Sequence, residues 1–339
     1  MRTLMIRRRN GFTLVELLVA IAIIGLLVAI AVPTAYSAYK RSKVAALKME
    51  VTNIQMAIEQ YKQKYGDYPP DGSNTDLVTR HLRKAFPRIA MTEFKALNDA
   101  SGTAQTGFPV MDTAESLVFF LGGFSDDPQK PLTGPGGPLT VIDASGATWV
   151  VQYNSERSNA IYDFDPKRLT IDQSTGATLS TDEVIFGGGS GGDALPAYLG
   201  KGLRTPIVYF DSRTYGFQTP VGYVFNKYYG GALNGVARPY KSNMVNTNVP
   251  ATAATPAEFD RRVKYVNDKT FQIVCAGLDD AFGGVLAPVN SVDVLFEYPS
   301  GNAIHPDTGV ASQYNRYDEK QLDNITNYSE ATLEDGLPN

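Results

Sequence analysis

A long apolar segment near the start of the sequence carries one charged side chain. Residues 12–32 read FTLVELLVAIAIIGLLVAIAV, and Glu16 is the charged residue among them. A helix of this length spans roughly 30 Å, the thickness of the hydrocarbon core of a bilayer. Basic residues precede it, and such residues remain on the cytoplasmic side of a membrane: Arg2, Arg7, Arg8 and Arg9. We therefore expect a single membrane-spanning helix, with the rest of the chain outside the cytoplasm.

Two simpler explanations of this segment are less satisfactory. An ordinary signal peptide has a shorter apolar region and is followed by a small-x-small cleavage site, which the sequence after Val32 does not contain. A plain membrane anchor does not explain Glu16, because a carboxylate in a lipid-facing helix costs about 2.5–3.5 kcal/mol. Such a charge calls for a partner, and a positive group on a neighbouring copy would supply one.

The residues around Glu16 match a known signature. The stretch Gly11-Phe12-Thr13-Leu14-Val15-Glu16, with basic residues before it and an apolar run after it, resembles the motif of type IV prepilins and type II secretion pseudopilins. The resemblance implies that a prepilin peptidase cleaves after Gly11 and methylates the new amino terminus of Phe12. It also implies that Glu16 neutralises the terminal ammonium of an adjacent subunit in a filament. Pro33, at a position where the family tolerates proline, predicts a kink or a locally melted turn.

A second amphipathic pattern follows the apolar segment. Apolar residues recur every three or four positions, which marks one face of a continuous helix: Val44, Leu47, Val51, Ile54, Ile58, Tyr61 and Tyr65. We expect this face to lie against the chain's own head rather than to form a coiled-coil seam. Gly66, Pro69 and Pro70 should end the helix.

The remainder of the chain alternates short helical and strand-like segments with turns rich in glycine and proline. Helical patterns occur within residues 77–97 and 113–122, and strand-like runs at 148–153, 183–186, 206–210, 222–225 and 271–274. The expected fold is α+β and pilin-like, with a long N-terminal helix packed on an antiparallel β-sheet head that carries large loop insertions. The expected division is a leader at 1–11, a transmembrane and stalk helix at 12–65, and a globular head at 66–339.

Several function classes are disfavoured. The net charge of −4 and the absence of basic clusters beyond the leader give no reason to expect nucleic acid as a partner. Cys275, the single cysteine, is expected to be a buried small hydrophobe, and His81 and His305 ordinary surface or loop residues. The glycine run 187–192 has the spacing of a dinucleotide fingerprint, but no helix of sufficient length follows it. No nucleophile–base motif is present, so we expect no enzyme.

Two segments near the C-terminus carry a further resemblance. Residues 271–283 are similar to the strand and Ser-x-Gly-x-Asp-Gly segment of major pseudopilins, and residues 323–328 to the segment that closes those proteins. In that family the two segments hold one calcium ion, which implies that Asp279 and Asp323 are calcium ligands here. The sequence differs in having Cys275 for serine, Asp280 for glycine and a longer separation. The alternative is that these aspartates cap turns.

Together these features predict a structural subunit of a type II secretion pseudopilus. Its expected partners are further copies of itself, other pseudopilins, the prepilin peptidase, the inner-membrane secretion platform and, before assembly, membrane lipid. The expected location is the inner membrane, with the head in the periplasm and the assembled filament in the periplasm or at the cell surface. Two alternatives remain open: a surface type IV pilin or minor pilin used in adhesion, motility or DNA uptake, and a membrane-tethered binding domain exported with a pilin-type signal.

Overall fold

A computed structural model describes most of the chain. The described residues are 13–100, 111–171, 194–219, 222–230, 234–249, 255–283, 294–304 and 317–338. The chain divides into two compact units, residues 1–43 and residues 44–339. The strand expected at 183–186, the glycine run 187–192 and His305 lie outside the described residues.

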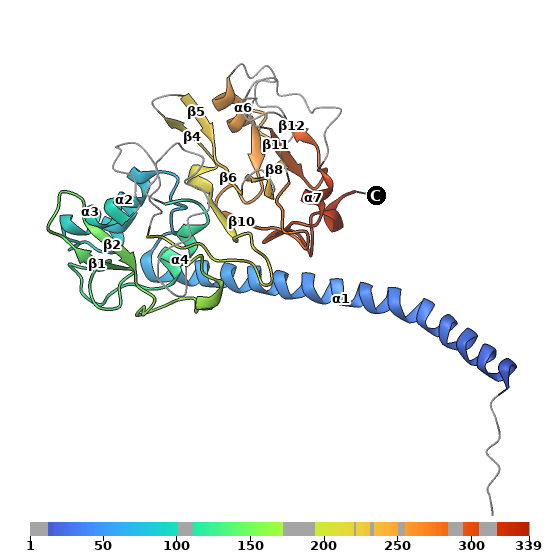
Figure 1. The fold of residues 1–339 in the computed structure, drawn as a ribbon. Coiled ribbons are helices and arrows are strands. Elements are labelled where there is room, and N and C mark those ends of the chain that lie inside the picture. Colours follow the sequence, from blue (N-terminus) through green and yellow to red (C-terminus); the bar gives the residue numbers. More distant parts are fainter. Residues whose placement is uncertain are drawn as a thin grey trace, which may run out of the picture. The chain divides into compact units, whose positions relative to one another are not determined.

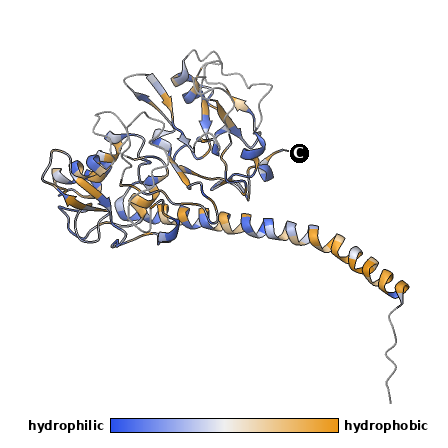
Figure 2. Cartoon of the chain, viewed as in Figure 1, coloured by the Kyte–Doolittle hydropathy of each residue, from blue (hydrophilic) through white to orange (hydrophobic). Residues whose placement is uncertain are grey.

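Helix α1 (Leu14–Tyr65) is the longest element of the chain and runs through Pro33 without interruption (Figure 1). The melted turn expected at Pro33 is therefore not found. Beside the proline, the Thr34 hydroxyl donates hydrogen bonds to the carbonyl oxygens of Ile30 (3.0 Å) and Ala31 (2.9 Å). The first part of α1 is apolar (Figure 2), and its large side chains are about half exposed or more, as Leu14 and Ile24 illustrate. Among residues 13–43 nothing covers this surface.

The second part of α1 is embedded in the second unit. The predicted stripe is confirmed: Leu47, Val51, Ile54, Ile58 and Tyr61 are all buried, and Val44 and Tyr65 are partly buried against the same core. Strands β3 (Val208–Asp211) and β10 (Phe271–Cys275) contribute Tyr209, Phe271, Ile273 and Cys275 to that core. The helix ends at Gly66, whose φ of 77° favours glycine and whose N–H bonds the Lys62 carbonyl oxygen at 2.8 Å.

The strands of the second unit form several small sheets rather than a single large one. The sheet that shares its core with α1 has the order β13-β10-β3, with antiparallel pairs, where β13 is Ile325–Thr326. A second sheet has the order β12-β11-β8-β9, and its β11–β8 pair is parallel. The strands of this second sheet are Ala303–Ile304, Leu295–Tyr298, Lys241–Val245 and Val263–Tyr265.

Short ribbons and helices complete this unit. The two-stranded ribbons are β1 (Leu139–Asp143) with β2 (Val150–Tyr153), β4 (Gly216–Thr219) with β5 (Gly222–Phe225), and β6 (Tyr228–Tyr229) with β7 (Val236–Ala237). The α-helices are α2 (Thr75–Ala85), α3 (Met91–Ala100), α4 (Glu115–Leu121), α6 (Pro256–Arg262) and α7 (Glu319–Leu322). Three 3-10 turns are η1 (Pro166–Arg168), η2 (Ser212–Thr214) and η3 (Glu334–Gly336). This arrangement confirms the α+β class and the long N-terminal helix.

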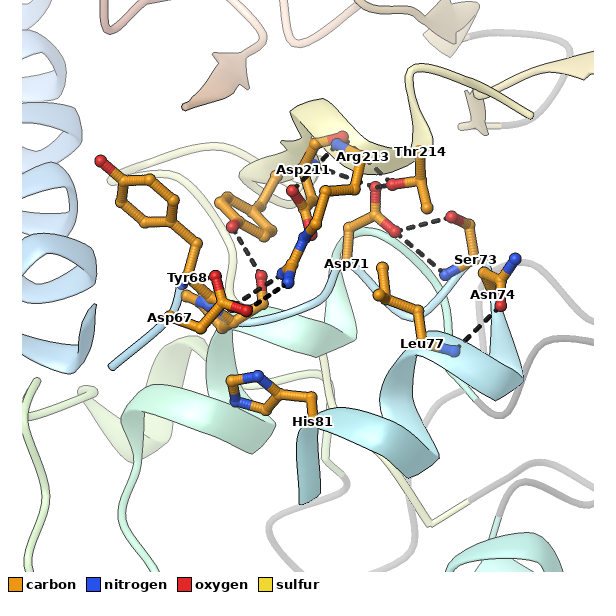
Figure 3. A network of polar contacts seen from close by, with 12 residues as sticks. Asp67, Tyr68, Asp71, Ser73, Asn74, Leu77, His81, Asp211, Arg213 and Thr214 are labelled. Carbon is orange, nitrogen blue, oxygen red and sulfur yellow. Dashed lines mark hydrogen bonds and ion pairs between the residues drawn. The ribbon is translucent and has the colours of Figure 1, made fainter. Parts of the chain in front are cut away.

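A polar network ties the turn after α1 to strand β3 (Figure 3). The Arg213 guanidinium contacts the carboxylates of Asp211 (2.7 Å) and Asp67 (2.8 Å) and the carbonyl oxygen of Tyr68 (2.8 Å). The fully buried Asp71 carboxylate accepts hydrogen bonds from the Asp211 N–H (3.0 Å), and from side chains of Ser73, Thr214 and Asn226. Burial, aided by the neighbouring Asp71 charge, raises the pKa of Asp211 to about 7 against the opposing effect of Arg213. The network fixes the chain direction where the helix ends.

His81 is not a surface residue, and the sequence-based expectation for it was wrong. It lies on α2 with an exposed fraction of 3%, and its Nε2 is 2.8 Å from the hydroxyl of Tyr61 on α1. Its ring also lies edge-on to Phe120. Burial, together with the positive charges of Arg213 and Lys84, lowers the pKa of His81 to about 4, against the effect of Asp67. The imidazole therefore remains neutral in the folded protein at neutral pH.

We expect His81 to make the protein sensitive to mild acid. The folded-state pKa lies below the unfolded value, so the stability due to neutral His81 is present above pH 6.5 and is lost as the pH falls toward 4. Between pH 7.5 and pH 5 the wild type should lose about 2 kcal/mol more unfolding free energy than His81→Gln. Urea unfolding of the full chain in detergent, followed by near-ultraviolet circular dichroism, measures this difference. Equal pH dependence in the two proteins would contradict it.

Candidate functional sites

The N-terminal site consists of the residues around the start of α1. Gly11 and Phe12 lie outside the described residues, so their processing stays a prediction. Thr13 precedes the helix, and the Glu16 carboxylate accepts hydrogen bonds from the Thr13 N–H (2.9 Å) and the Thr13 hydroxyl (2.8 Å). The Glu16 N–H in turn contacts the Thr13 hydroxyl oxygen at 3.2 Å. This reciprocal arrangement is a capping box, which the sequence analysis did not identify.

Within the described part of the chain, the Glu16 carboxylate has neutral donors and no cation as partners. Both donors from Thr13 are neutral, and the Glu16 side chain is exposed. The helix N-terminus favours a nearby anion, since its backbone N–H groups carry partial positive charge. Among the described residues, α1 is the one helix whose length and composition would allow it to cross a membrane. An exposed acid therefore lies at the beginning of an exposed apolar helix.

The second site is a pair of carboxylates in the second unit. Asp279 follows strand β10, and Asp323 lies between helix α7 and strand β13. Because β10 pairs with β13, with Cys275 opposite Ile325, the segments that flank these strands lie close together. The Asp279 N–H is 3.2 Å from Asp323 Oδ2. The structure thus brings together the two residues that the resemblance selected, although they are 44 positions apart.

The environment of Asp323 is tightly packed and incompletely satisfied. A Cβ atom on Gly277 would collide with the Asp323 carboxylate, so this approach requires glycine at position 277. Asp323 Oδ1 is buried and has no hydrogen-bond partner within the described part of the chain. Burial, followed by the negative charge of Asp279, raises the pKa of Asp323 to about 6. Two adjacent carboxylates, one with an unsatisfied buried oxygen, provide ligands of the type that a hard cation such as Ca²⁺ prefers.

These two side chains do not form a complete metal site by themselves. No group of three or more His, Cys, Asp or Glu side chains suited to a metal ion occurs within the described residues. Calcium takes six to eight oxygen ligands, and backbone carbonyls and water commonly supply part of them. The carboxylate pair therefore fits calcium only if main-chain oxygens of the two loops or water complete the coordination.

The sequence differences from the pseudopilin pattern have structural explanations. Asp280, in place of glycine, adopts a φ of 63°, the left-handed conformation in which glycine is favoured and Asp is tolerated. Its Oδ1 accepts hydrogen bonds from the N–H groups of Arg204 (2.8 Å) and Thr205 (2.9 Å). Asp279 Oδ1 also caps its own turn through the Ala281 N–H at 3.0 Å. Cys275 is buried in β10 as expected, and burial raises its pKa. Asp279 thus caps its own turn with one oxygen, while Asp280 binds the separate segment at Arg204 and Thr205.

A basic residue that no sequence pattern indicated connects the C-terminal loop to α1. The Lys48 ammonium donates hydrogen bonds to the carbonyl oxygens of Thr326 (2.7 Å) and Ser329 (2.5 Å). Two positions further along the helix, Glu50 forms a bidentate ion pair with Arg168. A sequence pattern gives no signal for these contacts, because each partner is more than one hundred residues away.

Comparisons with known proteins agree with this description. Residues 6–32 match the family model of the prokaryotic N-terminal methylation motif. The chain is 26% identical over 171 residues to a probable minor fimbrial protein of Dichelobacter nodosus, which is 50% of this chain and 99% of that protein. It is 36% identical over 63 residues to type II secretion system core protein G of Pseudomonas aeruginosa, covering 19% of this chain and 44% of that protein.

A further relative is a type IV major pilin protein of Neisseria gonorrhoeae, 30% identical over 71 residues, which are 21% of this chain and 42% of the pilin. The chain thus spans less than half the length of the secretion protein and of the gonococcal pilin. No solved structure matches this chain. The chain thus carries the prokaryotic N-terminal methylation motif at the start of a long helix, and the proteins it resembles are fimbrial proteins, a type IV pilin and a type II secretion protein.

We expect the contact between Gly277 and Asp323 to be measurable in a double-mutant cycle. Gly277→Ala should lower the unfolding free energy by about 1–3 kcal/mol, because its methyl group overlaps the Asp323 carboxylate. The same substitution in an Asp323→Ala background should cost less, since the overlap with the carboxylate is removed and the overlap with the Asp323 carbonyl oxygen remains. Denaturant unfolding of the four proteins gives the coupling energy, and equal costs in both backgrounds would contradict the contact.

Proposed function

We propose that this chain is a structural subunit of a filament, built into the pseudopilus of a type II secretion system through its N-terminal helix. The observation that carries the proposal is the methylation motif at the start of a helix whose apolar surface is exposed, while the same helix continues into the core of the second unit. A helix of this kind needs lipid or other apolar helices around its first part. A bundle of such helices from successive subunits would supply that environment.

The residues at the N-terminus have defined roles in this proposal. Cleavage after Gly11 by the prepilin peptidase removes the basic leader and exposes the amino group of Phe12, which is then methylated. In the membrane, the Glu16 carboxylate keeps its hydrogen bonds to Thr13. In the filament, the terminal ammonium of a neighbouring copy approaches Glu16 and provides the cation that the capping box lacks. An ion pair in an apolar surrounding then replaces two separately buried charges.

The location follows from the same motif. Before assembly the subunit would cross the inner membrane once, with its head in the periplasm and its leader facing the cytoplasm. The secretion platform would extract it from the lipid into the growing filament, beside further copies and other pseudopilins. The work is mechanical and needs no catalytic residues. The named relatives are likewise fimbrial and secretion-system components.

A surface type IV pilus subunit is the second candidate. The similarity to the probable minor fimbrial protein favours it, because it covers 99% of that protein. The pairing of Asp279 with Asp323 favours the pseudopilus, because the resemblance that selected these two residues is to the major pseudopilins. The two candidates share the N-terminal mechanism and differ in whether loss of the subunit abolishes protein secretion or surface filaments.

Glu16→Ala tests the filament proposal, with Thr13→Ala as its matched control. Both substitutions remove the capping box, but Glu16→Ala alone removes the charge. Glu16→Ala should leave membrane insertion and leader removal intact and abolish incorporation beside wild-type copies, whereas Thr13→Ala should still be incorporated. Incorporation is measured by electron microscopy and immunoblotting of sheared filaments, and N-terminal sequencing should give methylated Phe12.

Normal filaments from Glu16→Ala, or a mature protein that keeps its leader, would contradict the mechanism. In the native host, Glu16→Ala should also stop the release of folded proteins into the medium. If secretion continues while surface filaments disappear, the surface pilus assignment replaces the pseudopilus.

We further propose that Asp279 and Asp323 bind one calcium ion that joins the two loops. The buried, unsatisfied Asp323 Oδ1 and the contact of Asp323 with Asp279 support the proposal, because a cation bound there would give this oxygen a partner. Calcium would cross-link the ends of β10 and β13, next to the loop held by Lys48. A chain with a single cysteine has no intramolecular disulfide to do this.

Thermal unfolding with calcium and with excess chelator tests the calcium site. Saturating calcium should raise the melting temperature of the wild type by roughly 5 °C or more, because a ligand that binds only the folded state stabilises it. Asp323→Asn should lose most of this increase, whereas Asp76→Asn, at an exposed position of α2, should keep it. An unchanged midpoint in the wild type would remove the proposal.

A further inference from the structure

The second unit contains a completely buried lysine that belongs neither to the N-terminal site nor to the pair Asp279 and Asp323. Lys241, the first residue of strand β8, has an exposed fraction of 0%. Its Nζ lies 2.6 Å from Asp260 Oδ1 and 2.9 Å from the carbonyl oxygen of Val263. The same nitrogen lies 3.4 Å from the ring centre of Tyr265 and 5.6 Å from the ring centre of Phe259. An amine and a carboxyl group thus face each other in an aromatic surrounding.

The Asp260 carboxyl group is held by two tyrosines, one on each oxygen. The Tyr265 hydroxyl donates to Oδ1 at 2.6 Å, and the Tyr223 hydroxyl donates to Oδ2 at 2.6 Å. Burial, aided by the Asp260 charge, raises the pKa of both phenols, so they remain hydrogen-bond donors. Such donors withdraw electrons from the carboxyl carbon and make it more electrophilic. Gly216 allows this close packing, because a Cβ there would overlap the Tyr223 hydroxyl and Asp260 Oδ2.

We propose that Lys241 and Asp260 condense to form an intramolecular amide bond that links strand β8 to helix α6. Lys241 Nζ, after giving up a proton, attacks the carboxyl carbon of Asp260, and a C–N bond forms as one C–O bond breaks. The two protons that leave the ammonium combine with the departing oxygen, with Tyr223 passing one of them to Oδ2. The products are one amide and one water molecule, so no oxidant, reductant or cofactor is required.

Physical properties of the site favour this condensation over a permanent ion pair. Burial lowers the pKa of Lys241 to about 8, so that the nucleophilic amine is accessible near neutral pH. The reaction converts two buried charges into a neutral amide and so removes their desolvation penalty. The new amide N–H can keep the hydrogen bond to Val263, and the amide oxygen can keep the one from Tyr265. The chain, which has one cysteine, would thereby gain a covalent cross-link.

Mass spectrometry of the full chain purified in detergent tests the proposal. Trypsin cleaves after lysine and arginine but not before proline, so Arg238, which precedes Pro239, is resistant. The condensed protein should yield peptide 228–261, uncleaved at Lys241 and lighter than its sequence by one water molecule. The unreacted protein should instead yield peptides 228–241 and 242–261 at their full masses, and this result would overturn the proposal.

Lys241→Arg and Asp260→Ala are the matched controls. Both should be cleaved after position 241 and have the full mass calculated from their sequences, whether or not they fold. A wild-type peptide that has lost water but is still cleaved after Lys241 would indicate a cyclic imide at an aspartate, and would also overturn the proposal. Comparing intact masses of the wild type and Asp260→Ala cancels any N-terminal processing common to both.

Discussion

The rest of the second unit depends on the packing of one face of α1 against strands β3 and β10. Leu47, Val51, Ile54, Ile58 and Tyr61 provide that face, and each is buried almost completely. Burying large apolar side chains stabilises a fold by about 1.5–3 kcal/mol each, so this contact outweighs any single hydrogen bond in the molecule. It also fixes β10, and β10 in turn places β13 and the Asp279–Asp323 pair. The polar network around Arg213 then holds the turn where α1 ends.

The sequence predicts those elements that follow from the periodic spacing of apolar residues. It does not predict the burial or the contacts of residues whose partners are distant in the chain. The stripe on α1 and its end at Gly66 follow from spacing and from glycine, and both were confirmed. His81 was misjudged because a lone histidine gives no periodic signal; its burial depends on the Tyr61 hydroxyl, which reaches it from another helix. The proximity of Asp279 and Asp323 could be expected only from a resemblance, since 44 residues separate them. The capping box at Thr13 and Glu16 was readable from the sequence and was overlooked.

Ion pairs with little solvent exposure join separate segments of the second unit. Arg168 binds Glu50 on α1, and Lys241 binds Asp260. A buried ion pair adds little net stability, because desolvation offsets most of the attraction, but breaking one partner is costly. Such pairs therefore specify which loop meets which element more than they strengthen the fold. Each of them joins segments that sequence periodicity leaves unconnected, which is why none was predicted.

The two parts of α1 have different surfaces: the second part is apolar on one face, and the first part is apolar all round. From Val44 onward, the helix is apolar on one face and polar on the other, which suits a head that covers half of it. Between Leu14 and Val32, exposed apolar side chains lie on all sides of the helix, so no single face is distinguished as the one that packs against the rest of the chain. The carboxylate of Glu16 interrupts this apolar surface in the first turn of the helix, where the N–H and hydroxyl of Thr13 are neutral hydrogen-bond donors to it. Those donors satisfy its hydrogen bonds without cancelling its charge, so the acid can be held in place by Thr13 while still attracting a cation from another molecule.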